Sequence, residues 1–195
     1  MADSVAQQKY RRVRDILNLL KSVRDTNLAD SITTVNDLTR GVRDGKTSHV
    51  SHLFTSISDD ATAELLIKVG EKELHVYKKI SITGEATFRF FEGTAVSSDG
   101  TSVPTVDRNR NDNVAAFSTF FHTPTVTDVG TELSVEVILG GTSNGGPPTP
   151  TVGAASGELA VWVLKPNTNY LIRTTNTSGS SQRATITADF FEVDT

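Results

Sequence analysis

The segment ELHVYKKISITGEATFRFFEG, residues 73–93, decides the fold class of this chain. In its first half the apolar residues that share one parity are Leu74, Val76, Ile80 and Ile82. In its second half Ala86, Phe88 and Phe90 do the same. Successive side chains of a β-strand point to opposite faces of the sheet, so this period of two predicts two half-buried strands.

The same strand-like residue pattern continues to the end of the chain. From residue 63 onward β-branched and aromatic residues dominate, and turn residues recur about every eight to twelve positions, as in β-sandwiches. With the two strands above, further strands bring the total to about eight: 63–69, 114–122, 132–140, 158–165, 169–176 and 183–193. We therefore predict a mainly β fold, an antiparallel β-sandwich of jelly-roll type, over residues 63–195. Its expected core aromatics are Phe88, Phe90, Phe117, Phe121, Trp162, Tyr170, Phe190 and Phe191.

Residues 1–46 have a different pattern, which predicts an α-helical arm. Apolar residues recur at three- and four-residue steps in 4–24 and again, more briefly, in 32–42. Short helices are marginal in water alone, so each apolar stripe needs a partner surface. Two alternatives remain open: the helices fold back on the body or on each other, or they dock on another protein or on further copies of the chain.

Charge separates the arm from the rest. Residues 1–46 contain nine Lys or Arg against six Asp, although the net charge of the chain is -4. A basic arm on an acidic body favours docking of the arm on an acidic partner. The basic residues alternate with acids rather than forming a block, so we do not expect nucleic acid as that partner. Residues 47–62 are polar and are interpreted as a linker.

Motifs for catalysis or metal binding are missing from the sequence. There is no cysteine, no Gly-x-Ser-x-Gly elbow and no phosphate-binding loop. His49 and His52 have the spacing of a helical metal pair, but no third ligand adjoins them. The loop 106–113 supplies oxygen atoms suited to calcium, yet Arg108 and Arg110 interrupt it and favour hydrogen bonds within the protomer or across a subunit interface. We therefore expect no enzyme, no metal and no cofactor, and no run of ~18 apolar residues suggests a membrane span.

Several segments in order resemble a known family. The stretch ITGEATFRFFEGTAVSSDGTSVPTVDRNRN at 82–111 is followed by HTPTVTDVGTEL at 122–133, VWVLKPNTNYLIRTTNTS at 161–178 and ATITADFFE at 184–192. Together they resemble small virion proteins of tailed bacteriophages, of the head decoration or minor capsid type. The resemblance covers about residues 63–193 and implies a β-sandwich bound to the outside of a capsid, often as a trimer, without enzymatic activity.

These observations lead to one functional expectation and one alternative. We expect a capsid decoration protein on the virion surface, assembled in the host cytoplasm, with the major capsid protein and further copies of itself as partners. The expected contact residues are Arg11, Arg12, Val13, Arg14, Leu17, Leu20, Arg24, Val35, Leu38, Arg108 and Arg110. The alternative is a head- or tail-fibre module that binds a host receptor or surface glycan, with the loop 140–157 as its contact.

Overall fold

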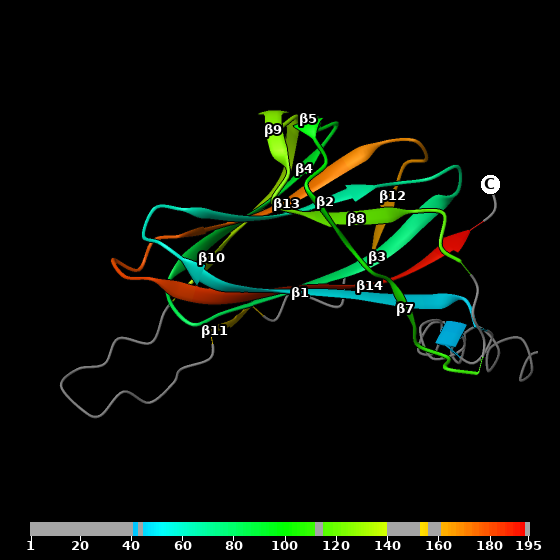
Figure 1. The fold of residues 1–195 in the computed structure, drawn as a ribbon, viewed down its shortest axis with the longest axis horizontal. Coiled ribbons are helices and arrows are strands. Elements are labelled where there is room, and N and C mark those ends of the chain that lie inside the picture. The colour runs from blue at the N-terminus through cyan, green and yellow to red at the C-terminus, as the bar shows by residue number, and fades with distance from the viewer. Residues whose placement is uncertain (1–40, 43–44, 112–114, 140–152, 156–160, 194–195) are drawn as a thin grey trace, which may run out of the picture. The chain divides into compact units, whose positions relative to one another are not determined.

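The computed structural model describes residues 41–42, 45–111, 115–139, 153–155 and 161–193 of the chain (Figure 1). Contacts divide the chain into two units, 1–41 and 42–195. Nearly all of the described residues belong to the second unit, called the body below. The predicted helical arm over 1–46 lies almost entirely outside the described residues.

The body is mainly β, as the sequence predicts, and its strand pairs are antiparallel. Sheet A has the strand order β11-β3-β14-β1-β7, and β12 also pairs with β3. Its strands are β1 (Thr47–Ile57), β3 (Glu73–Ile82), β7 (Val106–Asp107), β11 (Gly153–Ala155), β12 (Trp162–Leu164) and β14 (Gln182–Val193).

Sheet B has the order β10-β4-β13-β2-β8-β6. Its strands are β2 (Thr62–Lys68), β4 (Ala86–Glu92), β6 (Thr101–Val103), β8 (Thr119–His122), β10 (Thr131–Ile138) and β13 (Asn169–Asn176). The remaining two, β5 (Ala95–Ser98) and β9 (Thr125–Asp128), pair only with each other among the described strands.

Strands from the first half of the body pair with strands from the second half in reverse order. β1 pairs with β14, β2 with β13, β3 with β11 and β12, and β4 with β10. Successive strands β1, β2, β3 and β4 alternate between the two sheets. The body is therefore one long antiparallel pairing of strands, and it folds over so that sheets A and B face each other.

Figure 1 shows sheets A and B as two layers. The hydrophobic core fills the space between them. Aromatic rings meet across it: Phe120 of β8 lies 4.8 Å from Phe190 of β14, and Phe90 of β4 lies 5.3 Å from Trp162 of β12, centroid to centroid. Two layers with inward apolar side chains and one shared core make a sandwich-like arrangement.

A smaller hydrophobic cluster lies on the other face of sheet B. Leu66, Phe91 and Leu171 are buried there beneath Val96 of β5 and Val126 of β9. Along the chain β5 leads into β6, and β8 leads into β9, so the pairs β5–β9 and β6–β8 form one two-stranded ribbon. The ribbon bends at Gly100 and Thr123, which both have positive φ. The bend folds β5 and β9 over the outer face of the sheet, where they stand above it in Figure 1.

Residues 47–57 form β1, so the prediction of a linker over 47–62 is wrong for this segment. Strand β1 pairs with β14 from Thr47 to Ile57 and holds Val50 and Ile57 in the core. A register shift between Phe54 and Ile57 breaks the period of two, and a histidine occupies one inward position. Both features hide the strand from a pattern search.

The predicted core aromatics are confirmed for Phe88, Phe90, Tyr170 and Phe190, which are all buried. Phe117 is an error, because its side chain is exposed beside Lys72, whose Nζ lies 4.5 Å from the ring centroid. Strand β8 begins at Thr119, two residues after Phe117, and the buried ring from this segment is Phe120.

Candidate functional site

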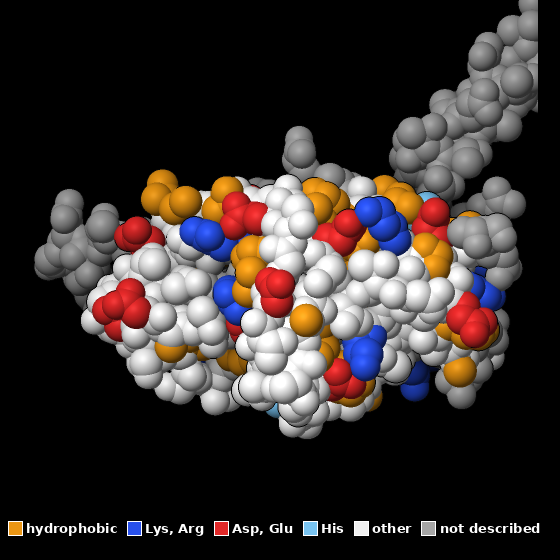
Figure 2. Space-filling model, turned by 90° about the horizontal axis from the view of Figure 1, so that it is seen from above, with side chains coloured by type: hydrophobic (Ala, Val, Ile, Leu, Met, Phe, Trp, Pro, Cys, Tyr) orange, Lys and Arg blue, Asp and Glu red, His pale blue; other side chains and the backbone are white. Residues whose placement is uncertain are grey.

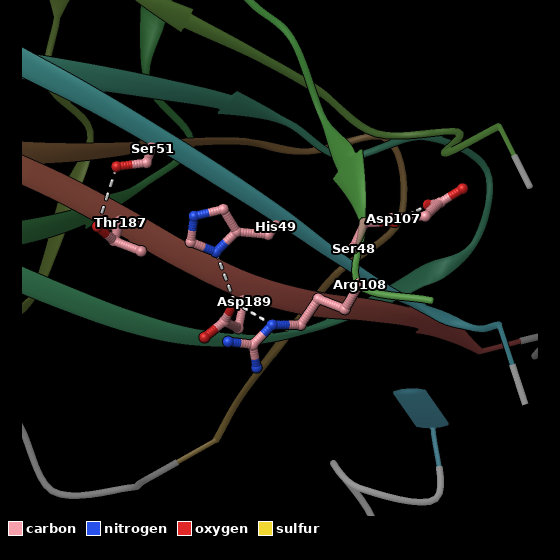
Figure 3. A network of polar contacts seen from close by, with 7 residues as sticks. All are labelled: Ser48, His49, Ser51, Asp107, Arg108, Thr187 and Asp189. Carbon is pink, nitrogen blue, oxygen red and sulfur yellow. Dashed lines mark hydrogen bonds and ion pairs between the residues drawn. The ribbon is translucent and has the colours of Figure 1, made fainter. Parts of the chain in front are cut away.

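A polar network surrounds the start of β1, the strand at which residues 1–46 enter the body (Figure 3). Its centre is Asp189 of β14. The Asp189 Oδ1 atom lies 2.7 Å from His49 Nδ1 and 3.4 Å from Arg108 Nε. The Ser48 hydroxyl donates a buried hydrogen bond of 2.8 Å to Asp107 of β7. We call Ser48, His49, Asp107, Arg108 and Asp189 the junction network.

The junction network joins three strands at one point. Strand β7 contributes only two residues to sheet A, yet the Arg108 amide also donates to the Thr47 carbonyl at 2.9 Å. Each of the two contacts to Asp189 is half exposed, so each contributes modestly to stability alone. Together they tie the residues after β7 to β1 and β14.

Two of the expected contact residues lie in the described part of the chain. Arg108 is engaged within its own protomer by Asp189, whereas Arg110 is exposed. The other nine lie outside the described residues: Arg11, Arg12, Val13, Arg14, Leu17, Leu20, Arg24, Val35 and Leu38.

His49 and His52 lie on a strand, so their spacing does not bring them together. His49 faces Asp189 on the outer face of sheet A. The His52 ring points between the sheets and stacks on His122 of β8, with 3.8 Å between centroids and 11° between planes. Among the described residues no group of three His, Cys, Asp or Glu side chains comes together as a metal site.

The stacked histidines connect the two sheets. Phe54 packs edge-on against His52 at 4.6 Å between centroids, which shields one side of the pair. Burial, together with the charge of His122, lowers the pKa of His52 below its ordinary value. The stack therefore favours the neutral form of His52.

Lys78 occupies an inward position of β3, between the two sheets. Its Nζ lies 4.5 Å from the Phe88 ring centroid, 5.4 Å from those of Phe90 and Trp162, and 3.6 Å from Glu136 Oε1 of β10. Burial lowers the pKa of Lys78, and Glu136 opposes that shift. The aromatic faces and the carboxylate together stabilise an ammonium group that is nearly excluded from water.

Exposed aliphatic side chains occur on β10 of sheet B and on β12 of sheet A. Five of the eight large exposed hydrophobic residues in the described part lie on these two strands or directly beside them: Val135, Val137, Leu139, Val161 and Val163. The face that carries β5 and β9, seen in Figure 2, shows hydrophobic side chains in small groups between charged ones.

Sequence reasoning missed Lys78 and the histidine stack, and it named Arg108 of the junction network without its partners, for one physical reason. Each brings together residues from strands that are distant along the chain, and their pairing is set by the winding of the ribbon. For Lys78 one signal was available: its parity matches that of Val76 and Ile80 on the core face of β3, which predicts an inward side chain.

Comparison with known proteins adds no further constraint, since no family model, curated protein or solved structure matches the chain. In the part of the chain that the structure describes, no helix has the length and apolar character needed to cross a membrane.

Proposed function

We propose that this chain is a structural virion protein that binds the outer surface of a phage head, with a jelly-roll body and residues 1–46 as its helical anchor. The order of strand pairs supports the jelly-roll assignment. In such a fold an antiparallel ribbon of eight strands wraps into two sheets, and viral capsid and lectin domains use it repeatedly. The pairs β1–β14, β2–β13, β3–β12 and β4–β10 follow that winding.

A fold alone does not define a function, so the proposal rests on the attachment of the arm. An anchor must be joined to an element that resists being pulled out of the body. β1 is paired with β14 on one side and with β7 on the other, and the junction network fastens its first residues. The observation that carries the proposal is this reinforced junction directly after a basic segment.

Multivalent binding would then stabilise the shell. Each copy contributes a modest contact through its arm, and many copies held on one lattice reinforce one another. The basic arm would meet an acidic capsid surface, while residues 47–195 are acidic overall.

Co-sedimentation of the purified chain with heads of its phage tests the proposal. Charge reversal of Arg11, Arg12 and Arg14 to Glu should reduce occupancy at least tenfold, and deletion of residues 2–46 should abolish it. Reversal of the exposed body residues Lys79 and Arg183 is the matched control and should leave occupancy within twofold. Full occupancy after arm deletion would refute the anchor.

The position on the particle separates this function from a fibre module. Many symmetric copies over the shell agree with head decoration. A few copies at the portal or tail would support the receptor- or glycan-binding alternative instead.

A further inference from the structure

The four histidines of the chain all lie in its described part, and they form two kinds of pair. Two of them contact a carboxylate. His49 Nδ1 lies 2.7 Å from Asp189 Oδ1, and His75 Nε2 lies 2.8 Å from Glu73 Oε1. A histidine takes up a proton near pH 6.5, and at these two positions the proton would meet a negative charge. Mild acid therefore strengthens both contacts.

The other two histidines, His52 and His122, contact each other instead. Their rings are nearly parallel with 3.8 Å between centroids, so protons on both rings would place two positive charges face to face. Phe54 lies edge-on to both rings, 4.6 Å from His52 and 6.3 Å from His122 between centroids. Mild acid therefore weakens this contact, in contrast to the two histidine–carboxylate contacts.

The described strands around the stack bring no carboxylate to it. Besides burial, the charge of His122 is the cause that lowers the pKa of His52. The positions paired with the two histidines are uncharged: Ile186 of β14 lies opposite His52, and Leu65 of β2 and Thr101 of β6 lie opposite His122. Strands β6 and β8 have no charged side chain apart from that of His122.

The charged side chains of β2 and β14 are directed elsewhere. Glu64 and Lys68 of β2 lie on the face opposite to its core residues, and each forms an ion pair there. Arg183 and Asp189 share the outer face of β14. Glu192, at the end of β14, accepts hydrogen bonds from two backbone amides. A second proton on the stack is thus not compensated by any of these groups.

The stack lies where the two-stranded ribbon bends. His122 is the last residue of β8, and its Nδ1 lies 3.0 Å from the hydroxyl of Thr123, which has φ of 55°. The His122 carbonyl oxygen packs against Gly100, the other residue at the bend. Strand β1 belongs to sheet A and β8 to sheet B, so the stack is also a contact between the two layers.

We propose that the stack of His52 and His122 is an acid-sensitive latch between sheets A and B. Near neutral pH the rings are uncharged and the latch is closed. As the pH falls toward about 5, protons on both rings drive them apart, and the corner formed by β1, β6 and β8 opens while the remaining strands stay paired. The latch is independent of the capsid-binding function proposed above.

A single buried cysteine in the full chain reports this opening, because the chain has no cysteine of its own. Val50→Cys places a thiol on the core face of β1, two positions before His52. Val76→Cys on the core face of β3 is the matched control, since both valines are 0% exposed. The readout is the rate of labelling by a disulfide reagent that reacts in acid, divided by the rate for an unfolded cysteine peptide at the same pH.

Between pH 8 and pH 5 this relative rate should rise roughly tenfold or more at position 50, because the corner opens. At position 76 it should change less than about twofold, because the rest of the core stays closed. An equal rise at both positions would indicate general unfolding and would overturn the latch. The absence of any rise at position 50 would overturn it as well.

Variants of the stack, made with Val50→Cys, test the role of the two charges. His122→Glu converts the stack into the histidine–carboxylate kind of pair, so acid should no longer increase labelling. His52→Phe keeps a ring but removes one of the two protons, and should also abolish the increase. His75→Phe is the control and should retain it.

Urea unfolding at pH 8 establishes that each variant is folded. If His122→Glu does not fold, His52→Phe carries the comparison alone. An acid response that persists in folded His52→Phe would assign the opening to other groups and would refute the latch.

Discussion

Lys78 illustrates how a single inward charge is tolerated in this core. Burial of a charged pair costs desolvation energy, and its mutual attraction often only offsets that cost. Here the aromatic rings of Phe88, Phe90 and Trp162 supply additional stabilisation from three sides. The pair of Lys78 and Glu136 therefore contributes little net stability. The loss of one partner alone has the larger effect on the free energy of unfolding.

Removing Glu136 alone should destabilise the body more than removing Lys78. Glu136→Ala leaves a nearly buried ammonium without its carboxylate and should lower the free energy of unfolding by roughly 1–2 kcal/mol, a figure reduced because Glu136 is partly exposed. Lys78→Met should change it by less than about 1 kcal/mol. Urea unfolding of both single variants and the double variant measures the coupling.

The outward Lys79→Met serves as the control for the loss of a lysine from β3. If Glu136→Ala is neutral while the double variant is less stable than either single variant, the two residues do not act as a pair.

The stacked pair of His52 and His122 should make stability depend on pH. The pKa of His52 is lowered in the folded protein, so the unfolded chain binds more protons below about pH 6.5. The stability that comes from neutral His52 is complete above that pH and decreases as the pH falls toward the folded-state pKa. Denaturant midpoints at pH 5 and pH 8 measure the difference.

His52→Phe keeps an aromatic ring against His122 and removes the titrating group. The change in midpoint between pH 8 and pH 5 should shrink in this variant. An unchanged difference would assign the pH dependence to other groups.

At the scale of elements, the bent ribbon formed by β5, β6, β8 and β9 depends on one glycine. A Cβ at Gly100 would lie 2.3 Å from the His122 carbonyl oxygen, and the residue has φ of 88°. The chain therefore requires both the backbone conformation and the absence of a side chain at this point. Without the bend, β5 and β9 could not cover Leu66, Phe91 and Leu171.

Gly100→Ala should lower the free energy of unfolding by roughly 2–4 kcal/mol, from positive-φ strain and a backbone clash together. Gly93→Ala is the matched control, because Gly93 has φ of 77° but no atom within 4 Å of an added Cβ. It should cost only about 1–2 kcal/mol. Equal losses in the two variants would mean that close packing at the bend is unimportant.

The sequence predicted the regularly alternating strands well, and it missed the short strands and β1, whose alternation is interrupted. Segments 73–83 and 85–93 alternate over many residues, and the structure has β3 and β4 there. Strands β6, β7 and β11 have too few residues to show a period, and their pairing comes from neighbours that are distant along the chain. The sequence named Arg108 of the junction network but not its partners, because Asp189 meets His49 and Arg108 only after β1 and β14 pair.

At the scale of the whole molecule, the hydrophobic core that the described residues form runs from Val50 to Phe190, within the body. A chain of residues 42–195 should therefore unfold cooperatively, with a denaturant midpoint close to that of the full chain. Circular dichroism and urea unfolding of both forms measure this. Loss of cooperative unfolding in the shorter chain would show that the first 41 residues are required for folding of the body.

The reversed order of strand pairs has a consequence for biosynthesis. Thr47 is paired with Phe191, so β1 gains its long neighbour β14 only when that last strand has left the ribosome, and before then it can pair only with the two residues of β7. Contacts between such distant residues carry a large loop-closure cost and make folding slow. During translation β1 and β3 lack β14, the strand that lies between them in sheet A, and their unpaired edges are prone to aggregation. The yield of soluble protein should thus depend on how quickly synthesis is completed, and a nascent chain stalled before residue 182 should depend on chaperones.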